Sequence, residues 1–135
     1  AQLATRALEM APRHVNAHVN LGIALVSLGR FDDAAAHFEA ALQLDPRCAD
    51  AHFNLAAYLF LQGDYRRAAD HYAAALEANP LDLEAEFGLA ASLARSGQTD
   101  EAVVRLRSLL QRDPAHRNAA ALLQELTRPP GERAP

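Results

Sequence analysis

Apolar residues in this chain recur every three or four positions over short segments, the spacing typical of an amphipathic helix. The first such segment covers residues 16–28, with apolar residues at Val19, Leu21, Leu25 and Leu28, and the second covers residues 32–44. A glycine follows the first segment and a proline follows the second. Glycine closes a helix in the left-handed conformation, and proline cannot continue the hydrogen-bond ladder. The pattern therefore predicts two helices joined by a tight turn.

This helix pair recurs along the sequence at a fixed period. Residues 49–80 superimpose on residues 15–46 without a gap at an offset of 34, and residues 83–114 form a third copy. Such self-similarity predicts a stack of units, in which each unit buries the apolar face of its neighbour. Prolines mark the same place in every copy, 34 residues apart: Pro12, Pro46, Pro80 and Pro114.

Two places in each unit hold small residues, which lets the paired helices approach closely. A larger side chain beside them fills the remaining space. The small residues are Gly22, Ala56 and Ala90 on the first helix and Ala34, Ala68 and Ala102 on the second, and the larger ones are Phe38, Tyr72 and Leu106.

The spacing of these residues resembles the tetratricopeptide repeat. In the first unit the resemblance rests on Leu21, Gly22, Gly29, Phe31, Ala34, Phe38, Ala41 and Pro46. The sequence departs from the repeat pattern at His18, His52 and Glu86, where the pattern often has Trp. The resemblance implies an all-α fold: an α-solenoid, wound as a right-handed superhelix of antiparallel helix pairs.

The resemblance also implies a division of the chain into one repeat domain, residues 1–126, and a tail. Since residues 1–11 align with the second half of a unit, we expect a leading helix without its partner. The expected parts are a half repeat at 1–14, full repeats at 15–48, 49–82 and 83–116, a capping helix at 117–126 and a disordered tail at 127–135.

In this family the first helix of each unit lines a concave groove, which usually binds an extended peptide or a partner helix. Helical spacing then predicts which residues face the groove, three or four apart on one side of each first helix. The predicted binding residues are Asn16, Val19, Asn20 and Ile23 in the first unit, Asp50, Phe53, Asn54, Ala57 and Phe60 in the second, and Glu84, Phe87 and Arg95 in the third.

Two rows in this set are candidates for ligand contact. Asn20 and Asn54 sit one repeat apart, and an amide offers both a donor and an acceptor to a peptide backbone. Alternatively, these amides bridge neighbouring helices. The second row is Val19, Phe53 and Phe87, an apolar strip if it is exposed; alternatively, curvature shields it.

Co-chaperone members of the family bind acidic C-termini through a clamp of two asparagines and three basic residues. Asn20 and Asn54 match the two asparagines, whereas Asn16, Glu84 and Gly88 stand at the basic positions. Without cations a terminal carboxylate lacks its charge-assisted partners. The sequence therefore predicts a neutral or basic peptide as partner, not an acidic C-terminus.

The composition excludes several other classes. The net charge is −4, and the 13 basic residues are all arginines, scattered without the basic patch that nucleic acid requires. No apolar run approaches the ~18 residues of a membrane span, and no signal peptide is present. The single cysteine, Cys48, excludes an internal disulfide; we expect the cytoplasm rather than the periplasm. The absence of lysine indicates a GC-rich bacterial genome.

Six histidines raise the question of a metal site. His18 with His52, and His37 with His71, form rows along the stack, but packed helices lie roughly 10 Å apart. Two imidazoles sharing a zinc lie about 2 Å from it. His14 is four residues from His18, at the mouth of a helix. We therefore expect packing or surface roles for the histidines, with no metal and no cofactor.

No phosphate loop or catalytic motif occurs in the sequence. The sequence therefore predicts a non-catalytic scaffold for protein–protein interaction. Two alternatives stay open. The chain could be the docking arm of a larger enzyme, such as a glycosyltransferase. It could also form homo-oligomers through the unpaired helix at residues 1–11.

Overall fold

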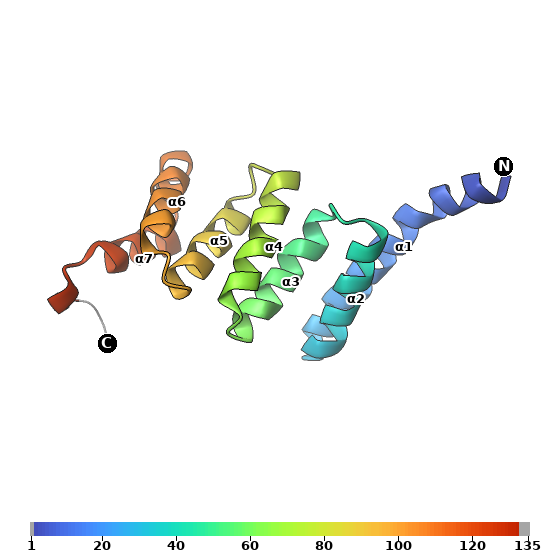
Figure 1. Ribbon diagram of the computed structural model, residues 1–135, viewed down its shortest axis with the longest axis horizontal. Coiled ribbons are helices and arrows are strands. Elements are labelled where there is room, and N and C mark those ends of the chain that lie inside the picture. Colours follow the sequence, from blue (N-terminus) through green and yellow to red (C-terminus); the bar gives the residue numbers. More distant parts are fainter. Residues whose placement is uncertain (1, 133–135) are drawn as a thin grey trace.

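The computed structural model describes residues 2–132, with side chains from residue 13 onward. Within this range every regular element is helical, which confirms the predicted all-α solenoid. Figure 1 shows the helices as a row of antiparallel pairs. They are α1 (Gln2–Ser27), α2 (Phe31–Leu44), α3 (Ala49–Leu61), α4 (Tyr65–Ala78), α5 (Leu83–Arg95), α6 (Thr99–Arg112) and α7 (Arg117–Thr127), followed by a 3₁₀ turn at Pro130–Glu132. Residues 133–135 of the expected disordered tail lie outside the described residues.

Glycine closes the first helix of each unit. The φ angles of Gly29, Gly63 and Gly97 are 77°, 82° and 87°, in the left-handed region that residues with a Cβ rarely adopt. The turn after each glycine then leads directly into the second helix. The predicted glycine stop is confirmed in all three units.

Polar side chains close the turns that follow α2 and α6. Asp45 Oδ1 accepts a hydrogen bond from the backbone amide of Arg47 at 3.1 Å, and Asp113 makes the same bond to Ala115 at 3.2 Å. Such Asx turns offer the backbone an alternative to continuing the helix. In both cases the proline stands inside this turn, so proline and aspartate act together to end the helix.

The first helix departs from the prediction. It was expected to begin at Asn16, after a separate helix at residues 1–11 ended by Pro12, but α1 runs from Gln2 without a break. The residue before Pro12 is Ala11, which has no side-chain acceptor for the turn that Asp45 makes. Proline without that turn does not end the helix here, so the predicted helix boundary is wrong.

Close packing within each pair depends on the small residues that the sequence marked. A Cβ atom on Gly22 would lie 2.5 Å from the ring of Phe38, which is 1% exposed. Ala34, Ala68 and Ala102 are equally buried on the second helices. One cluster of buried residues runs from α1 to α6, and a second cluster joins α5, α6 and α7.

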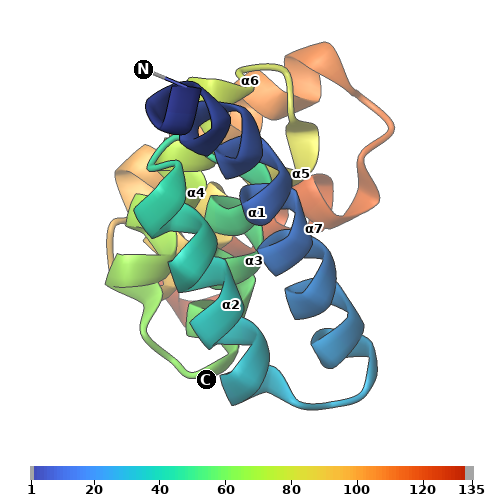
Figure 2. The same cartoon turned by 90° about the vertical axis from the view of Figure 1, so that its right-hand side faces the viewer.

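The stack curves toward its first helices. Each of these contacts the next, α1 to α3, α3 to α5 and α5 to α7. In the described part of the chain, α2, α4 and α6 make no contact with one another. Figure 2 looks along the stack and shows successive pairs rotated about its axis. The side lined by α1, α3, α5 and α7 is therefore the inner one.

Candidate functional site

An apolar cavity of about 60 Å³ opens where α1 and α3 face each other. Its mouth is formed by Val26 of α1 and by Ala57 and Leu61 of α3, and Leu61 is 71% exposed. Its wall also includes α2, which is packed behind both helices. The remaining lining residues are Phe31, Ala34 and Phe38 of α2 and Asn54 and Tyr58 of α3.

Exposed apolar side chains surround this cavity. Ile23 is 45% exposed, Val26 39% and Phe31 43%, so a partner that covers them would bury apolar surface. Of these, the sequence analysis placed Ile23 among the binding residues. Phe31 was missed because the sequence analysis looked for groove residues only on the first helix of each unit.

The predicted apolar strip is wrong at Val19, which is 5% exposed and belongs to the core between α1 and α2. Phe53 is half-buried and meets Tyr72 edge to face, with ring centroids 5.6 Å apart. Phe87 is half-buried against His116 at 5.3 Å. These residues pack within and between units, so they do not form an exposed strip.

Phe60 and Arg95 meet the same residue of α4. The ring of Phe60 lies 5.0 Å from that of Tyr65, and the guanidinium carbon of Arg95 lies 5.8 Å from the Tyr65 centroid. This cation–π contact ties Arg95 to the protein surface. The contact positions the Arg95 guanidinium but leaves its charge in place.

The two asparagines of the predicted row differ in environment. Asn20 is exposed on α1, as is Asn16. Asn54 is half-buried, and its Nδ2 donates to the Asp50 carbonyl of its own helix at 2.8 Å. Asn54 also lines the apolar cavity. The structure thus places one amide of the row at the cavity and leaves the other in solvent.

The third position of that row is glycine because a ring occupies the space. A Cβ on Gly88 would lie 2.5 Å from two ring carbons of Tyr72. Tyr72 is 7% exposed and burial raises the pKa of its phenol. No side chain fits at residue 88 unless Tyr72 moves, so the asparagine row is confined to the first two units.

Acidic groups flank the cavity and the groove. Asp32 Oδ1 accepts a hydrogen bond of 2.5 Å from the Tyr58 hydroxyl, and this bond raises the pKa of Tyr58 because it favours the protonated phenol. Asp50 is exposed on α3. Glu84 is exposed on α5, with Oε1 3.7 Å from His116 Nε2.

The histidines pair in a way that the sequence analysis did not find. It compared histidines along the stack, whereas His18 bonds to His37 and His52 to His71, across the two helices of one unit. The signal was present in the sequence, because these partners are 19 residues apart in both units. In the third unit the equivalent positions hold Glu86 and Arg105.

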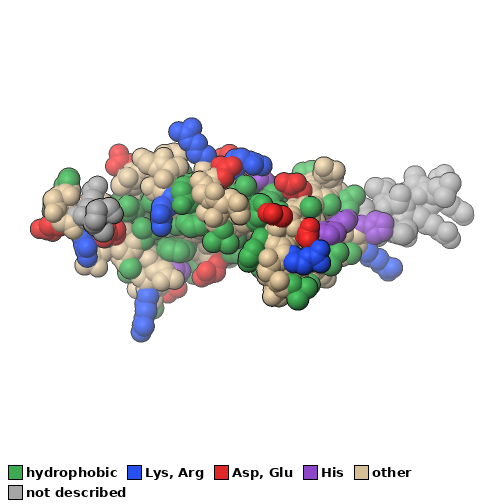
Figure 3. All heavy atoms as spheres, turned by 90° about the horizontal axis from the view of Figure 1, so that it is seen from below, with side chains coloured by type: hydrophobic (Ala, Val, Ile, Leu, Met, Phe, Trp, Pro, Cys, Tyr) green, Lys and Arg blue, Asp and Glu red, His purple; other side chains and the backbone are tan. Residues whose placement is uncertain are grey.

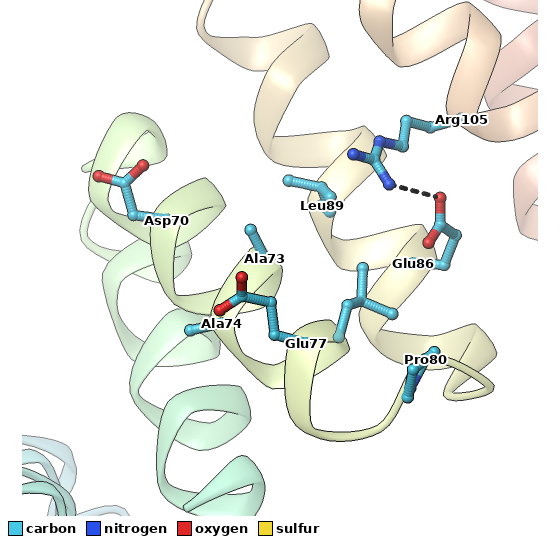
Figure 4. A pocket seen from close by; sticks show the side chains of 9 residues that line it. Asp70, Ala73, Ala74, Glu77, Pro80, Glu86, Leu89 and Arg105 are labelled. Atoms are coloured by element: carbon cyan, nitrogen blue, oxygen red, sulfur yellow. Dashed lines mark hydrogen bonds and ion pairs between the residues drawn. The ribbon is translucent and has the colours of Figure 1, made fainter. Parts of the chain in front are cut away.

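A larger hollow lies on the opposite side of the stack. It has a volume of about 570 Å³ and opens between α4 and α6, over α5. Figure 4 shows Asp70, Glu77 and Arg105 around it, with Arg105 directed at Glu86. Seen from below in Figure 3, charged side chains of both signs are interspersed on the surface of the stack. Unlike the cavity between α1 and α3, it has charged residues among its apolar lining.

Several further sites are not present in the described part of the chain. No helix there is long and apolar enough to span a membrane. The same residues contain no cluster of three or more metal-ligating side chains. Cys48, at the N-cap of α3, is a half-buried free cysteine.

The fold and the inner groove define a helical-repeat solenoid, a class whose curved surfaces serve protein binding. Two sequence models of the tetratricopeptide repeat match the chain, one at residues 1–45 and 19–82 and the other at residues 59–126. The chain belongs to the tetratricopeptide-repeat family. Members are generally non-catalytic modules for protein interaction.

Solved structures support the same fold. The second tetratricopeptide domain of human RPAP3, in complex with the HSP70 peptide SGPTIEEVD, has a TM-score of 0.81 at 15% identity, covering 88% of this chain and 99% of that one. The first such domain of Spaghetti (RPAP3), bound to the HSP90 peptide SRMEEVD, has a TM-score of 0.79 at 18% identity, covering 84% and 90%. A MamA D159K mutant has a TM-score of 0.76 at 24% identity, covering 83% and 65%. No curated protein matches the sequence.

Proposed function

We propose that this protein is a non-catalytic scaffold that holds an extended peptide or a partner helix in its inner groove. The cavity between α1 and α3 carries the proposal, because it is apolar, open to the groove and rimmed by exposed Val26 and Leu61. One apolar side chain of the partner fits there as an anchor. Asn54, which lines the same cavity, is placed to hydrogen-bond the partner's backbone.

We propose that the partner is neutral or basic around this anchor. Asp32 and Asp50 are exposed on the helices that form the cavity, and Glu84 lies further along the groove. Arg95 is held over Tyr65. A peptide like SRMEEVD would bring carboxylates to these acidic groups without the cations that pair with them.

A display library of random peptides tests this proposal. We expect selected peptides to combine a large apolar residue with neighbouring Lys or Arg, and we expect the synthetic peptide SRMEEVD not to bind. Leu61→Glu places a charge at the cavity mouth and should weaken the selected peptides more than about tenfold, since a buried unpaired charge is costly.

The matched control is Val104→Glu. Val104 is 67% exposed, close to the 71% of Leu61, but lies on α6, a second helix outside the groove. Equal affinity of the two variants for the selected peptides, or enrichment of acidic C-termini, would contradict the proposal.

A second candidate role is self-association through the exposed end of the first unit. Leu21 is 46% exposed, whereas its equivalents Leu55 and Leu89 are 2% and 4% exposed because the preceding second helix covers them. We propose that the same face of a second copy covers Leu21. Light scattering should then give a dimer that Leu21→Ser converts to a monomer; a monomeric wild-type chain would exclude this role.

A further inference from the structure

We propose that the histidine pairs of the first two units are binding sites for a divalent late first-row transition-metal ion. In the first pair, Nδ1 of His18 lies 3.1 Å from Nδ1 of His37. In the second, Nδ1 of His52 lies 3.0 Å from Nδ1 of His71. Each pair bridges the two helices of one unit, so a bound ion would link them.

The spacing of the nitrogens suits chelation. Imidazole nitrogens lie about 2.0–2.1 Å from such an ion, which places two of them about 2.9 Å apart at a right angle and about 3.3 Å apart at a tetrahedral angle. Both observed distances fall between these values. The ring centroids of the two pairs are 5.3 and 5.2 Å apart, so each Nδ1 now points at its partner, and both rings must turn before the two nitrogens face one ion.

The second pair is also oriented as a metal ligand would be. Nε2 of His52 lies 2.7 Å from the carbonyl oxygen of Pro46. A carbonyl only accepts, so Nε2 carries the hydrogen and Nδ1 of His52 presents a lone pair toward His71. A carbonyl that holds the far nitrogen of a histidine is the usual outer contact of a metal-bound imidazole.

Binding also needs a tautomer change at the other ring. Without an ion, Nδ1–H of His71 donates to Nδ1 of His52. When an ion binds, this proton moves through solvent to Nε2 of His71, and both rings stay neutral. The two Nδ1 lone pairs then reach the ion, and no net proton is released.

Charged groups of both signs act on the second pair. Asp70 and Glu39 favour a cation at His71, whereas Arg67 opposes it. An ion there would be held by the two imidazoles and not by the surrounding charge. Water completes the coordination, and copper(II) is the strongest binder among these ions.

The third unit provides an internal comparison. Its equivalent positions hold Glu86, which is 6% exposed, and Arg105, whose Nη1 lies 3.5 Å from Oε1 of Glu86. Arg112 Nη2 lies 4.0 Å from the other carboxylate oxygen. Figure 4 shows Arg105 and Glu86 directed at each other. A protein cation already bridges the helices here, so we expect no metal in this unit.

The test is a titration of the full chain with copper(II) at pH 7.5, followed by electron paramagnetic resonance. We expect one ion at each pair, with splitting from two imidazole nitrogens. The double variant His37→Gln, His71→Gln should bind more than about tenfold more weakly and lose that splitting, while circular dichroism shows that it stays helical.

The matched control is His14→Gln, which removes an exposed histidine one turn from His18. It should leave both sites intact. Unchanged copper binding in the double variant, or loss of a site in His14→Gln, would overturn the proposal. Glu86→His with Arg105→His should add a third site, and a folded variant that gains no ion would also count against it.

Discussion

At the scale of single residues, aromatic rings decide where the groove can carry side chains. Gly22 lies under Phe38 and Gly88 under Tyr72, each too close for a Cβ atom. The two contacts differ in direction, because Phe38 belongs to the same unit as Gly22 and Tyr72 to the unit before Gly88. The ring of Tyr72, which packs between two units, therefore also leaves no room for an asparagine at residue 88 of the groove.

Gly88→Ala should destabilise the protein by about 1 kcal/mol. Overpacking costs about 1–3 kcal/mol, and alanine recovers up to about 1 kcal/mol of helix propensity. The clash prevails because Tyr72 is 7% exposed and cannot swing into solvent. Urea denaturation measures the change. In a Tyr72→Leu background the same substitution should become stabilising. If Gly88→Ala alone stabilised the protein, the Tyr72 ring would be able to move away from the added methyl group.

Acid should destabilise the protein through His71. Its folded-state pKa is lowered from 6.5, so the unfolded chain binds more protons as the pH falls below about 6.5. The free energy of unfolding should therefore be highest above that pH and decrease from about pH 7 to pH 5. Denaturation at each pH measures it. His71→Gln should reduce the slope, and exposed His14→Gln should not; equal slopes would contradict this cause.

At the scale of helices, the first helices differ in how their N-termini are capped. Asp82 Oδ1 accepts from the amides of Glu84 and Ala85 at 3.0 and 3.1 Å. His116 Nδ1 accepts from the amide of Ala119 at 3.1 Å. Cys48, at the same place before α3, makes no side-chain cap. The residue at the N-cap therefore differs from unit to unit, and the repeat pattern does not determine it.

Exchanging these caps should shift stability in opposite directions. Asp82→Ala removes two hydrogen bonds to α5 and should cost about 1 kcal/mol. Cys48→Asp supplies the missing cap of α3 and should gain a similar amount. Urea denaturation of both variants checks the pair. A neutral result for Asp82→Ala would mean that water replaces its two bonds at no cost.

Many helix ends could be predicted from the sequence. The last residues of the expected segments 16–28, 32–44 and 117–126 lie within one residue of the last residues of α1, α2 and α7. Helix ends of this kind are predictable because glycine and the Asx–proline turn are local signals. The start of α1 could not be predicted, because Ala11 stands where the other units have a turn-forming residue.

The burial of residues along the groove could not be predicted either. Val19 and Ile23 lie one turn apart on α1, and only the packing of the units shows that Val19 is the buried one.

At the scale of the whole molecule, curvature divides the surface into two unlike faces. The inner face, where first helices touch, contains the small apolar cavity between α1 and α3. The outer face, where second helices separate, contains the wide hollow around Asp70 and Glu77. The period of the sequence implies this asymmetry, but the location of the cavity depends on how α2 packs behind two units.

The most direct measurement is a map of backbone amide shifts by nuclear magnetic resonance on adding a selected basic, apolar peptide. Binding in the inner groove should shift amides around Val26, Asn54 and Leu61 and leave those around Asp70 and Glu77 in place. Shifts concentrated at Asp70 and Glu77, with the cavity residues unmoved, would place the binding surface on the outer face and contradict the account.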